Sequence, residues 1–145
     1  MRLVLQRVLH AKVEVEGKNV GQIGPGLLVL VGFTGTDTAD LIPTAISKLT
    51  QLRIFADEAG KLNLSLLDTG GSLLVISQFT LYANCSRGRR PDFTHAAEPG
   101  KALELYNEFV RQCRLTGLPV ETGIFAADMQ VSLLNDGPIT INLEY

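Results

Sequence analysis

The sequence predicts an α+β fold, a compact single domain with a mostly antiparallel, barrel-like sheet and two main helices. First, 145 residues are the usual size of one domain, and no repeat or linker divides residues 1–145. Second, most segments alternate apolar and polar residues, as half-buried strands do, and only two segments place apolar residues at helical spacing. Third, the connections between segments are mostly short, which favours antiparallel neighbours.

The first three strands are expected in the N-terminal part of the chain. Residues 3–16 alternate apolar and polar side chains, and Gly17 begins a turn. Strands follow at 19–23 and 27–33, and the second is almost entirely apolar, which indicates a central position in the sheet. The glycines of GQIGPG between them leave two interpretations open, a phosphate-binding loop and a hairpin turn. The hairpin is favoured, because no Gly-Lys-Ser/Thr follows and no helix begins there.

Two segments have the periodicity of amphipathic helices. Residues 40–52 carry apolar side chains at helical spacing, and Pro43 is tolerated in a first turn. A second helix is expected over about 100–116, and Gly117 follows it as a stop signal. Cys113 lies on the apolar stripe of this second helix, which predicts a small core residue.

The remaining segments complete the sheet. Strands are expected at 53–57, at 72–83 and at 120–122. The final residues, 129–145, have the pattern of a strand pair, with Gly137-Pro138 near the position of the turn. An ordinary two-residue hairpin turn prefers Asn-Gly or Asp-Gly and no proline after it, so the Gly-Pro pair needs another explanation.

Composition narrows the class of protein. The formal net charge is −2, so contact with nucleic acid would need a local basic patch. No apolar run is long enough to cross a bilayer and no signal-peptide pattern is present, so we expect a cytoplasmic protein without membrane contact. The two cysteines and the two histidines are widely separated along the chain. We therefore expect no metal site and no cofactor.

One candidate site is SQFTL at 77–81, where an apolar strand changes to hydroxyl and amide side chains. Ser77, Gln78 and Thr80 alternate there with Phe79 and Leu81. A strand end of this kind can offer hydrogen bonds to a ligand. The alternative is a strand that simply reaches solvent.

A second candidate is the segment CSRGRRPDF at 85–93, the densest basic cluster of the chain. Arg87, Arg89 and Arg90 surround Gly88, and Phe93 follows. Guanidinium groups can bind phosphate oxygens, and a nearby aromatic ring could stack on a base. A solvated loop is the equally weighted alternative. If the segment binds RNA, the contact should weaken as salt rises.

The third candidate is NDGPIT at 135–140. Proline removes a backbone donor and glycine removes a side chain, so Gly137-Pro138 exposes main-chain carbonyl groups to close approach by a ligand. The alternative is a bulge or a tight turn between two strands. No GxSxG, no HExxH and no suggestive Cys-His spacing is present, so an enzyme built on these segments would need little from acid-base side chains.

These motifs resemble those of the bacterial and eukaryotic type of D-aminoacyl-tRNA deacylase. That family is marked by SQFTL, here 77–81, and NxGPxT, here 135–140, and QRV at 6–8 and SRGRRPDF at 86–93 also look like the family. The resemblance implies a homodimer with active sites at the subunit interface. It also implies hydrolysis of the ester that links a D-amino acid, or glycine, to the 3′ end of tRNA, a chiral proofreading activity.

The resemblance also implies roles for single residues. A cis Gly137-Pro138 bond reaches into the partner's pocket and rejects L-amino acids by shape. Backbone N–H groups around Gln78 and Phe79 are candidate donors to the developing oxyanion. Thr140 remains open between nucleophile and positioning group. The other implied residues line, bind or orient: Ser77 and Thr80 in the pocket, Arg7 and Asn135 at the Gly-Pro motif, and Arg87, Arg89 and Arg90 on tRNA.

Two alternatives to this activity stay open. One is a non-catalytic module that holds an RNA 3′ end or a free D-amino acid. The other is a related deacylase with an altered chiral preference.

Overall fold

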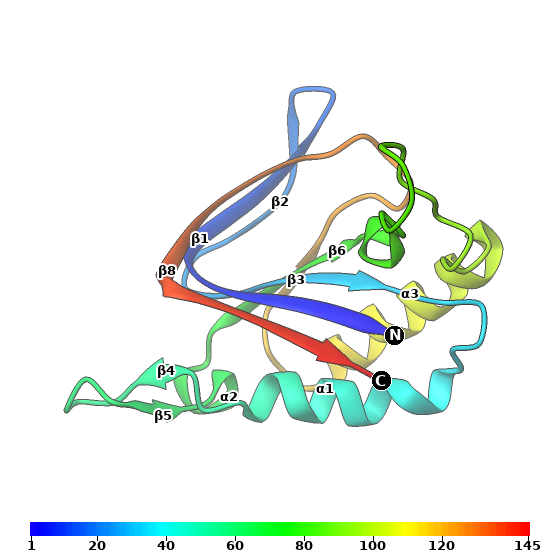
Figure 1. The fold of residues 1–145 in the computed structure, drawn as a ribbon. Coiled ribbons are helices and arrows are strands. Elements are labelled where there is room, and N and C mark those ends of the chain that lie inside the picture. The colour runs from blue at the N-terminus through cyan, green and yellow to red at the C-terminus, as the bar shows by residue number, and fades with distance from the viewer.

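Six strands form one strongly curved sheet in the computed structural model, which describes residues 1–145 (Figure 1). β1 (Arg2–Val15) organises the sheet because both of its edges are used. One edge pairs with β8 (Gln130–Glu144) along almost its whole length. The opposite edge pairs first with β3 (Gly26–Gly32) and then with β2 (Lys18–Ile23). These three pairings are antiparallel.

The other two strands extend the sheet beyond β3 with parallel pairing. β6 (Ser72–Ser77) runs parallel to β3, and β7 (Val120–Thr122) runs parallel to β6. Parallel neighbours need a crossover, and α1 (Ile42–Gln51) and α3 (Pro99–Leu115) lie in the two crossovers. The predicted α+β fold with two main helices and a mostly antiparallel sheet is therefore confirmed.

Several short elements connect these parts. β4 (Phe55–Ala56) and β5 (Leu62–Leu64) form a separate small hairpin, so the strand expected at 53–57 covers only two residues in the structure. The sequence patterns did not predict β5 or α2 (Leu66–Thr69), since three or four residues are too few to show a period. None of the helices is both long and apolar enough to span a bilayer. The short elements are η1 (Ala39–Leu41), β4 (Phe55–Ala56), β5 (Leu62–Leu64), α2 (Leu66–Thr69) and η2 (Phe79–Tyr82).

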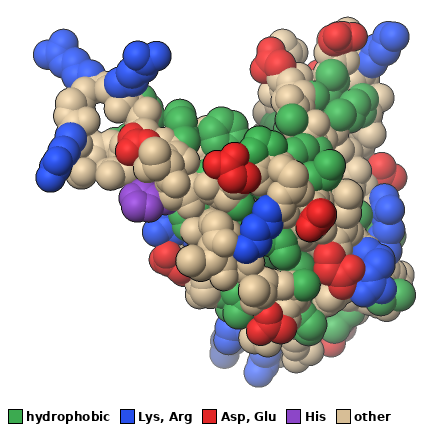
Figure 2. Space-filling model, turned by 90° about the vertical axis from the view of Figure 1, so that its right-hand side faces the viewer, with side chains coloured by type: hydrophobic (Ala, Val, Ile, Leu, Met, Phe, Trp, Pro, Cys, Tyr) green, Lys and Arg blue, Asp and Glu red, His purple; other side chains and the backbone are tan.

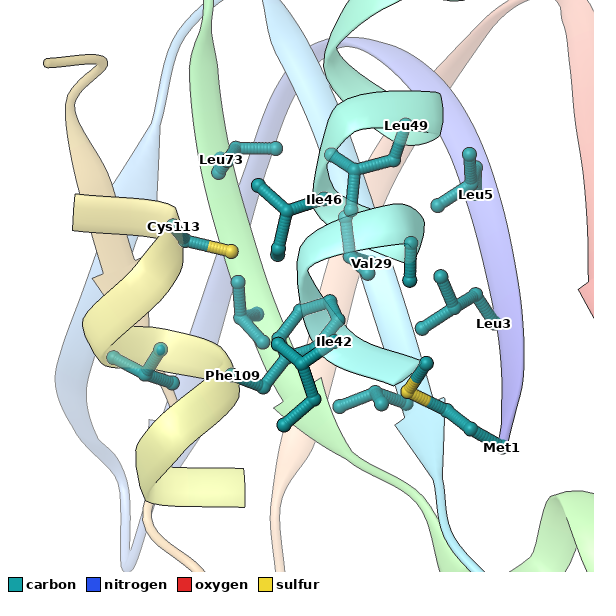
Figure 3. Packing of buried hydrophobic residues seen from close by; sticks show 14 of the residues in the cluster. Met1, Leu3, Leu5, Val29, Ile42, Ile46, Leu49, Leu73, Phe109 and Cys113 are labelled. Carbon is teal, nitrogen blue, oxygen red and sulfur yellow. The ribbon is translucent and has the colours of Figure 1, made fainter. Parts of the chain in front are cut away.

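The main core lies where α1 and α3 pack together against the sheet (Figure 3). Phe109 of α3 and Leu49 of α1 are completely buried there, against Leu5 of β1 and Val29 of β3. Cys113 is also completely buried, and burial raises the pKa of its thiol to about 12. The prediction that Cys113 is a small core residue is confirmed.

The strand expected over 72–83 is shorter than predicted. β6 ends at Ser77, and the chain turns into η2. The reason is the length of the neighbouring strand: β3 ends at Gly32, and the N–H of Gln78 donates the last cross-strand bond to Val31 O at 2.7 Å. Beyond that point the backbone has no partner strand. The apolar residues at 79 and 81 therefore alternate with polar ones without forming a strand.

The prediction of a strand pair over 129–145 is wrong. These residues form the single long strand β8, which turns a corner in Figure 1 but stays paired with β1 on both sides of it. Between Gln6 and Val8 the register shifts because β8 has extra residues there, which form a bulge. Between Val8 and His10 it shifts by one residue in the other direction, and the extra residue is Leu9 of β1. Residues 136–139 of NDGPIT form the bulge of β8, and Asn135 and Thr140 pair with β1 on either side of it. Of the two geometries considered for this segment, a bulge and a tight turn, the structure has the bulge.

GQIGPG does not form the hairpin favoured above. β2 and β3 do not pair with each other, and both run antiparallel to β1 along the same edge, so these glycines join two consecutive strand segments. They end β2 and begin β3, with no helix after them. A Cβ at Gly26 would lie 2.0 Å from the carbonyl oxygen of Ser72. Glycine is needed there for the close approach of β3 to β6, not for phosphate.

Candidate active site

An apolar cavity of about 590 Å³ opens at the end of β6. Its walls come from the ends of β3 and β6, from the start of α3 and from the segment 125–131. Thirteen of its nineteen lining residues are hydrophobic, the usual character of a small-molecule site. Among the predicted site residues, Ser77, Gln78 and Phe79 line this cavity.

The turn that carries these three residues is held from several sides. Arg2 donates from Nη1 to Leu81 O at 2.9 Å, and its guanidinium carbon lies 4.7 Å from the centre of the Tyr82 ring. Gln78 donates from Nε2 to the hydroxyl of Thr80 at 2.5 Å. Gly32 lies directly behind, where a Cβ would stand 2.6 Å from Gln78 O. The SQFT turn therefore has a fixed backbone, although the Phe79 side chain is 56% exposed.

Tyr82, the last residue of η2, offers no base at neutral pH. Burial, and next the negative charge of Asp37, raise the pKa of Tyr82 to about 12. Its phenol therefore stays protonated. No group of three or more His, Cys, Asp or Glu side chains in the chain is placed to hold a metal ion.

The Gly137-Pro138 motif is braced by two side chains. The peptide bond between the two residues is cis, and Gly137 has φ +125°. Arg7 donates from Nε to Asp136 O at 3.2 Å, pairs with the Asp136 carboxylate at 2.9 Å, and donates from Nη1 to Ile54 O at 2.6 Å. Asn135 donates from Nδ2 to Arg7 O and to Ile139 O, both at 2.9 Å. These bonds hold the bulge at one orientation on β1.

Thr140 lies just beyond the bulge, in register with Gln6 of β1. Its hydroxyl accepts a hydrogen bond from the Gln6 amide at 3.3 Å. An amide cannot remove a proton from a hydroxyl, so this contact orients the side chain and does not activate it as a nucleophile.

The single chain does not bring its two motifs together. Gly137, Pro138, Asn135, Thr140 and Arg7 are absent from the cavity lining. Gly137 and Pro138 are themselves exposed on the outer surface of the bulge. The cavity and the Gly-Pro motif are two separate surfaces of one molecule.

The arginine segment forms a projecting loop. Arg87, Arg89 and Arg90 are all exposed, and Figure 2 shows a projecting loop with three basic side chains at the upper left of the molecule. Two backbone hydrogen bonds between Asn84 and Asp92, of 2.7 and 3.0 Å, close the loop at its base. The three arginines therefore do not line the cavity, but Phe79 and Phe93, which flank their loop in the sequence, do.

Sequence reasoning missed much of the cavity wall. Phe33, Phe125 and Met129 line it, together with Glu98 at the start of α3 and Asp128 in the segment after β7. The apolar members carry no local signal, because a residue that lines a cavity looks like a core residue in the sequence. The positive φ of Ala126, 60°, is equally invisible in the sequence.

Comparison with known proteins identifies the family. The model of the D-Tyr-tRNA(Tyr) deacylase family matches residues 4–144. The D-aminoacyl-tRNA deacylase of Thermosipho africanus is 56% identical over 144 residues, covering 99% of this chain and 97% of that protein. The protein of the same name from Deinococcus radiodurans is 54% identical, covering 99% of each.

Two solved structures have the same fold. One is named c-Myc DNA Unwinding Element Binding Protein; it has a TM-score of 0.94 at 40% identity and covers 100% of this chain and 99% of its own. The other, a probable eukaryotic D-amino acid tRNA deacylase, has a TM-score of 0.85 at 18% identity, with 98% and 97% covered, and supports the fold alone. With the match over residues 4–144, these likenesses confirm the resemblance inferred from the motifs: the chain belongs to the D-Tyr-tRNA(Tyr) deacylase family.

Proposed function

We propose that this protein hydrolyses the ester bond between a D-amino acid and the 3′-terminal ribose of tRNA, and that glycyl-tRNA is a second substrate. The observation that carries the proposal is the position of the SQFT turn in the wall of a 590 Å³ cavity, in a chain that belongs to this family over nearly its full length. Charged tRNA as the substrate implies that the protein acts in the cytoplasm.

The reaction needs positioning more than reactive side chains. Water adds to the ester carbonyl carbon, the bond to the ribose oxygen breaks, and that oxygen leaves as a hydroxyl after gaining a proton. An aminoacyl ester is already activated, and the neighbouring ribose 2′-hydroxyl can assist. The protein then has to hold the ester and to donate hydrogen bonds to the oxyanion.

The N–H of Phe79 is our candidate oxyanion donor. The N–H of Gln78, the other candidate, already donates to Val31 O at 2.7 Å. Phe79 begins η2, and the first N–H groups of a helix have no acceptor within it. Ser77 lines the cavity beside this N–H, and Thr80 orients the turn through its bond with the Gln78 side chain. Thr140 takes a positioning role, since its partner is an amide.

Chiral selection is assigned to Gly137-Pro138 of a second copy. In one chain this motif is exposed and outside the cavity, so it reaches a cavity only if the protein forms a homodimer. Large apolar side chains beside it, Leu134 at 49% exposed and Leu9 at 48%, suit a protein interface. Inserted carbonyl groups would leave no space for an L side chain, whereas a D-amino acid or glycine would enter.

One assay tests the proposed function. Purified protein is incubated with matched D-, L- and glycyl-tRNA, with a chelator present, and free amino acid is measured. Release from the D and glycyl esters with the L ester intact is the expected result. Binding of tRNA without release would instead support a non-catalytic module, and turnover of L-alanyl-tRNA would support an altered chiral preference.

The arginine loop is assigned to the tRNA backbone, and this assignment predicts a change in salt dependence. Replacing Arg87, Arg89 and Arg90 by alanine should weaken tRNA binding. It should also make the slope of log K against log salt less steep by up to about 2, since each phosphate contact on a single strand contributes about 0.7. Binding titrations at several salt concentrations measure this slope.

A control for net charge accompanies the arginine variant. A triple alanine variant at three exposed lysines on other elements removes the same charge elsewhere and should leave the slope unchanged. An equal change in both variants would contradict the assignment of the loop. The control positions are Lys18, Lys48 and Lys61.

The close approach of Gly32 to Gln78 predicts a loss of activity on substitution. In Gly32→Ala the new Cβ meets Gln78 O at 2.6 Å, so the SQFT turn has to shift. We expect kcat for the D ester to fall about tenfold to a hundredfold, because displacements near 1 Å can cost that much. The free energy of unfolding should fall by only about 1–3 kcal/mol. Gly24→Ala, which meets nothing within 4 Å, should change neither quantity.

A further inference from the structure

The arginine loop has a rigid base. Asn84 and Asp92 exchange two backbone hydrogen bonds, and their side chains accept further ones. Ser86 N donates to Asn84 Oδ1 at 3.0 Å, and Thr94 donates from its N–H to Asp92 Oδ1 at 2.9 Å and from its hydroxyl to Asp92 Oδ2 at 3.1 Å. Between these two residues only the tip of the loop remains free of such bonds. The arginines are therefore carried by a loop whose base is fixed directly before Phe93.

Phe93 contacts the SQFT turn directly. Its ring stands edge-on to the ring of Phe79, with the centroids 5.0 Å apart and the planes at 68°. Both rings line the cavity, yet both are considerably exposed, Phe93 at 38% and Phe79 at 56%. Core packing therefore does not hold them in place. What orients Phe79 is the edge-to-face contact with Phe93, which is a favourable geometry for aromatic pairs.

The rest of the turn is already fixed from the opposite side. Arg2 binds Leu81 O, and Gly32 allows Gln78 O to approach β3. Phe79 is the first residue of η2, and it also carries the N–H that we assign to the oxyanion. Its ring is 56% exposed and is thus the least constrained apolar side chain of the turn and the one that Phe93 contacts.

We propose that Phe93 is a positioning residue that couples binding of RNA phosphates by the arginine loop to the alignment of Phe79 in the active site. This inference rests on the proposed function and goes beyond it. The arginines strengthen binding of the tRNA, whereas Phe93 raises kcat for the bound tRNA by aligning Phe79. A substrate that reaches the loop is therefore hydrolysed with a higher kcat than one that only fills the cavity.

Steady-state kinetics test the coupling on two substrates, D-tyrosyl-tRNA and the D-tyrosyl ester of adenosine, which lacks the phosphates. In Phe93→Ala we expect kcat for the tRNA to fall about three- to tenfold, the amount that one aromatic pair supports, with KM almost unchanged. The kcat for the adenosine ester should change little, so the advantage of the tRNA disappears. Phe93→Tyr, which keeps the ring, should restore the rate. Leu62→Ala, at a 57% exposed position on β5, is the control and should have no effect.

The opposite pattern overturns the proposal. If Phe93→Ala raises KM and leaves kcat unchanged, Phe93 only adds affinity. If both substrates lose rate equally, the residue supports the cavity without coupling. Absence of release by the unmodified protein would count against the proposed function itself and would be seen before any variant is made.

A second measurement does not depend on catalysis. The protein is labelled with fluorinated phenylalanine, and the Phe79 signal is assigned by substitution among the six phenylalanines. An RNA hairpin without a single-stranded 3′ end is then added, so that it reaches the loop but does not enter the cavity. We expect the Phe79 signal to shift in the unmodified protein and to stay in place in Phe93→Ala. A shift of equal size in both would refute the coupling.

Discussion

In Gly137→Ala, selectivity for the D ester over the L ester should fall at least tenfold. Gly137 has φ +125°, a backbone conformation that an L side chain rarely adopts. A Cβ there would also stand 3.0 Å from Ile139 Cγ1 and 3.2 Å from Arg7 Nη2, so the bulge has to move. Carbonyl groups that exclude an L side chain by shape lose their selectivity when they shift, since steric rejection is steep in distance. The measurement is kcat/KM for D- and L-tyrosyl-tRNA.

Stability has to be followed in the same variant. Strain at one backbone position costs about 1–3 kcal/mol, so urea denaturation should show a folded protein with a moderately lower free energy of unfolding. Gly35→Ala, a glycine with nothing within 4 Å, is the matched control and should keep full selectivity. Pro138→Ala should resemble Gly137→Ala. Unchanged selectivity in Gly137→Ala would remove the proposed role of the motif.

The second large effect concerns stability: Asp37→Asn should lower the free energy of unfolding by about 3–5 kcal/mol, because it leaves a buried charge without its partner. The N-terminal ammonium of Met1 lies 2.7 Å from Asp37 Oδ1, and the two side chains are 1% and 5% exposed. The other carboxylate oxygen accepts from Thr34 N at 2.8 Å. Asparagine keeps the volume and one acceptor but not the charge. Urea denaturation measures the loss.

An exposed ion pair gives the comparison for this variant. Arg111 pairs with Glu108 at 2.7 Å on the surface of α3, where solvent screens the interaction. Glu108→Gln should therefore leave the urea midpoint nearly unchanged. Equal effects of Asp37→Asn and Glu108→Gln would show that the buried pair contributes no more than a surface pair.

The long elements could be predicted from the sequence because their periods are local. The spacing of Ile42, Ile46 and Leu49 is enough to predict α1, and the alternation of residues 3–16 is enough to predict β1. What could not be predicted depends on partners distant in the sequence. β6 stops at Ser77 because β3 stops at Gly32, and no pattern within 72–83 contains that information.

The same limit applies to the C-terminal segment and to the site. Gly137-Pro138 suggested the turn of a strand pair, but the length of β1 allows one continuous partner strand with a bulge instead. In the candidate site, the motifs identified Ser77 and Phe79, which are polar or exposed at the end of a strand. Phe125 and Met129 were missed, since only the three-dimensional fold separates the wall of a cavity from a core.

The placement of the cavity and the Gly-Pro bulge on separate surfaces has a genetic consequence. If two copies associate as proposed, each catalytic centre takes its cavity from one chain and its selective loop from the other. A subunit damaged at Gly32 and a subunit damaged at Gly137 would then be able to rescue each other. Their mixed dimer would contain one centre with both defects and one centre with neither, so two defective alleles would complement.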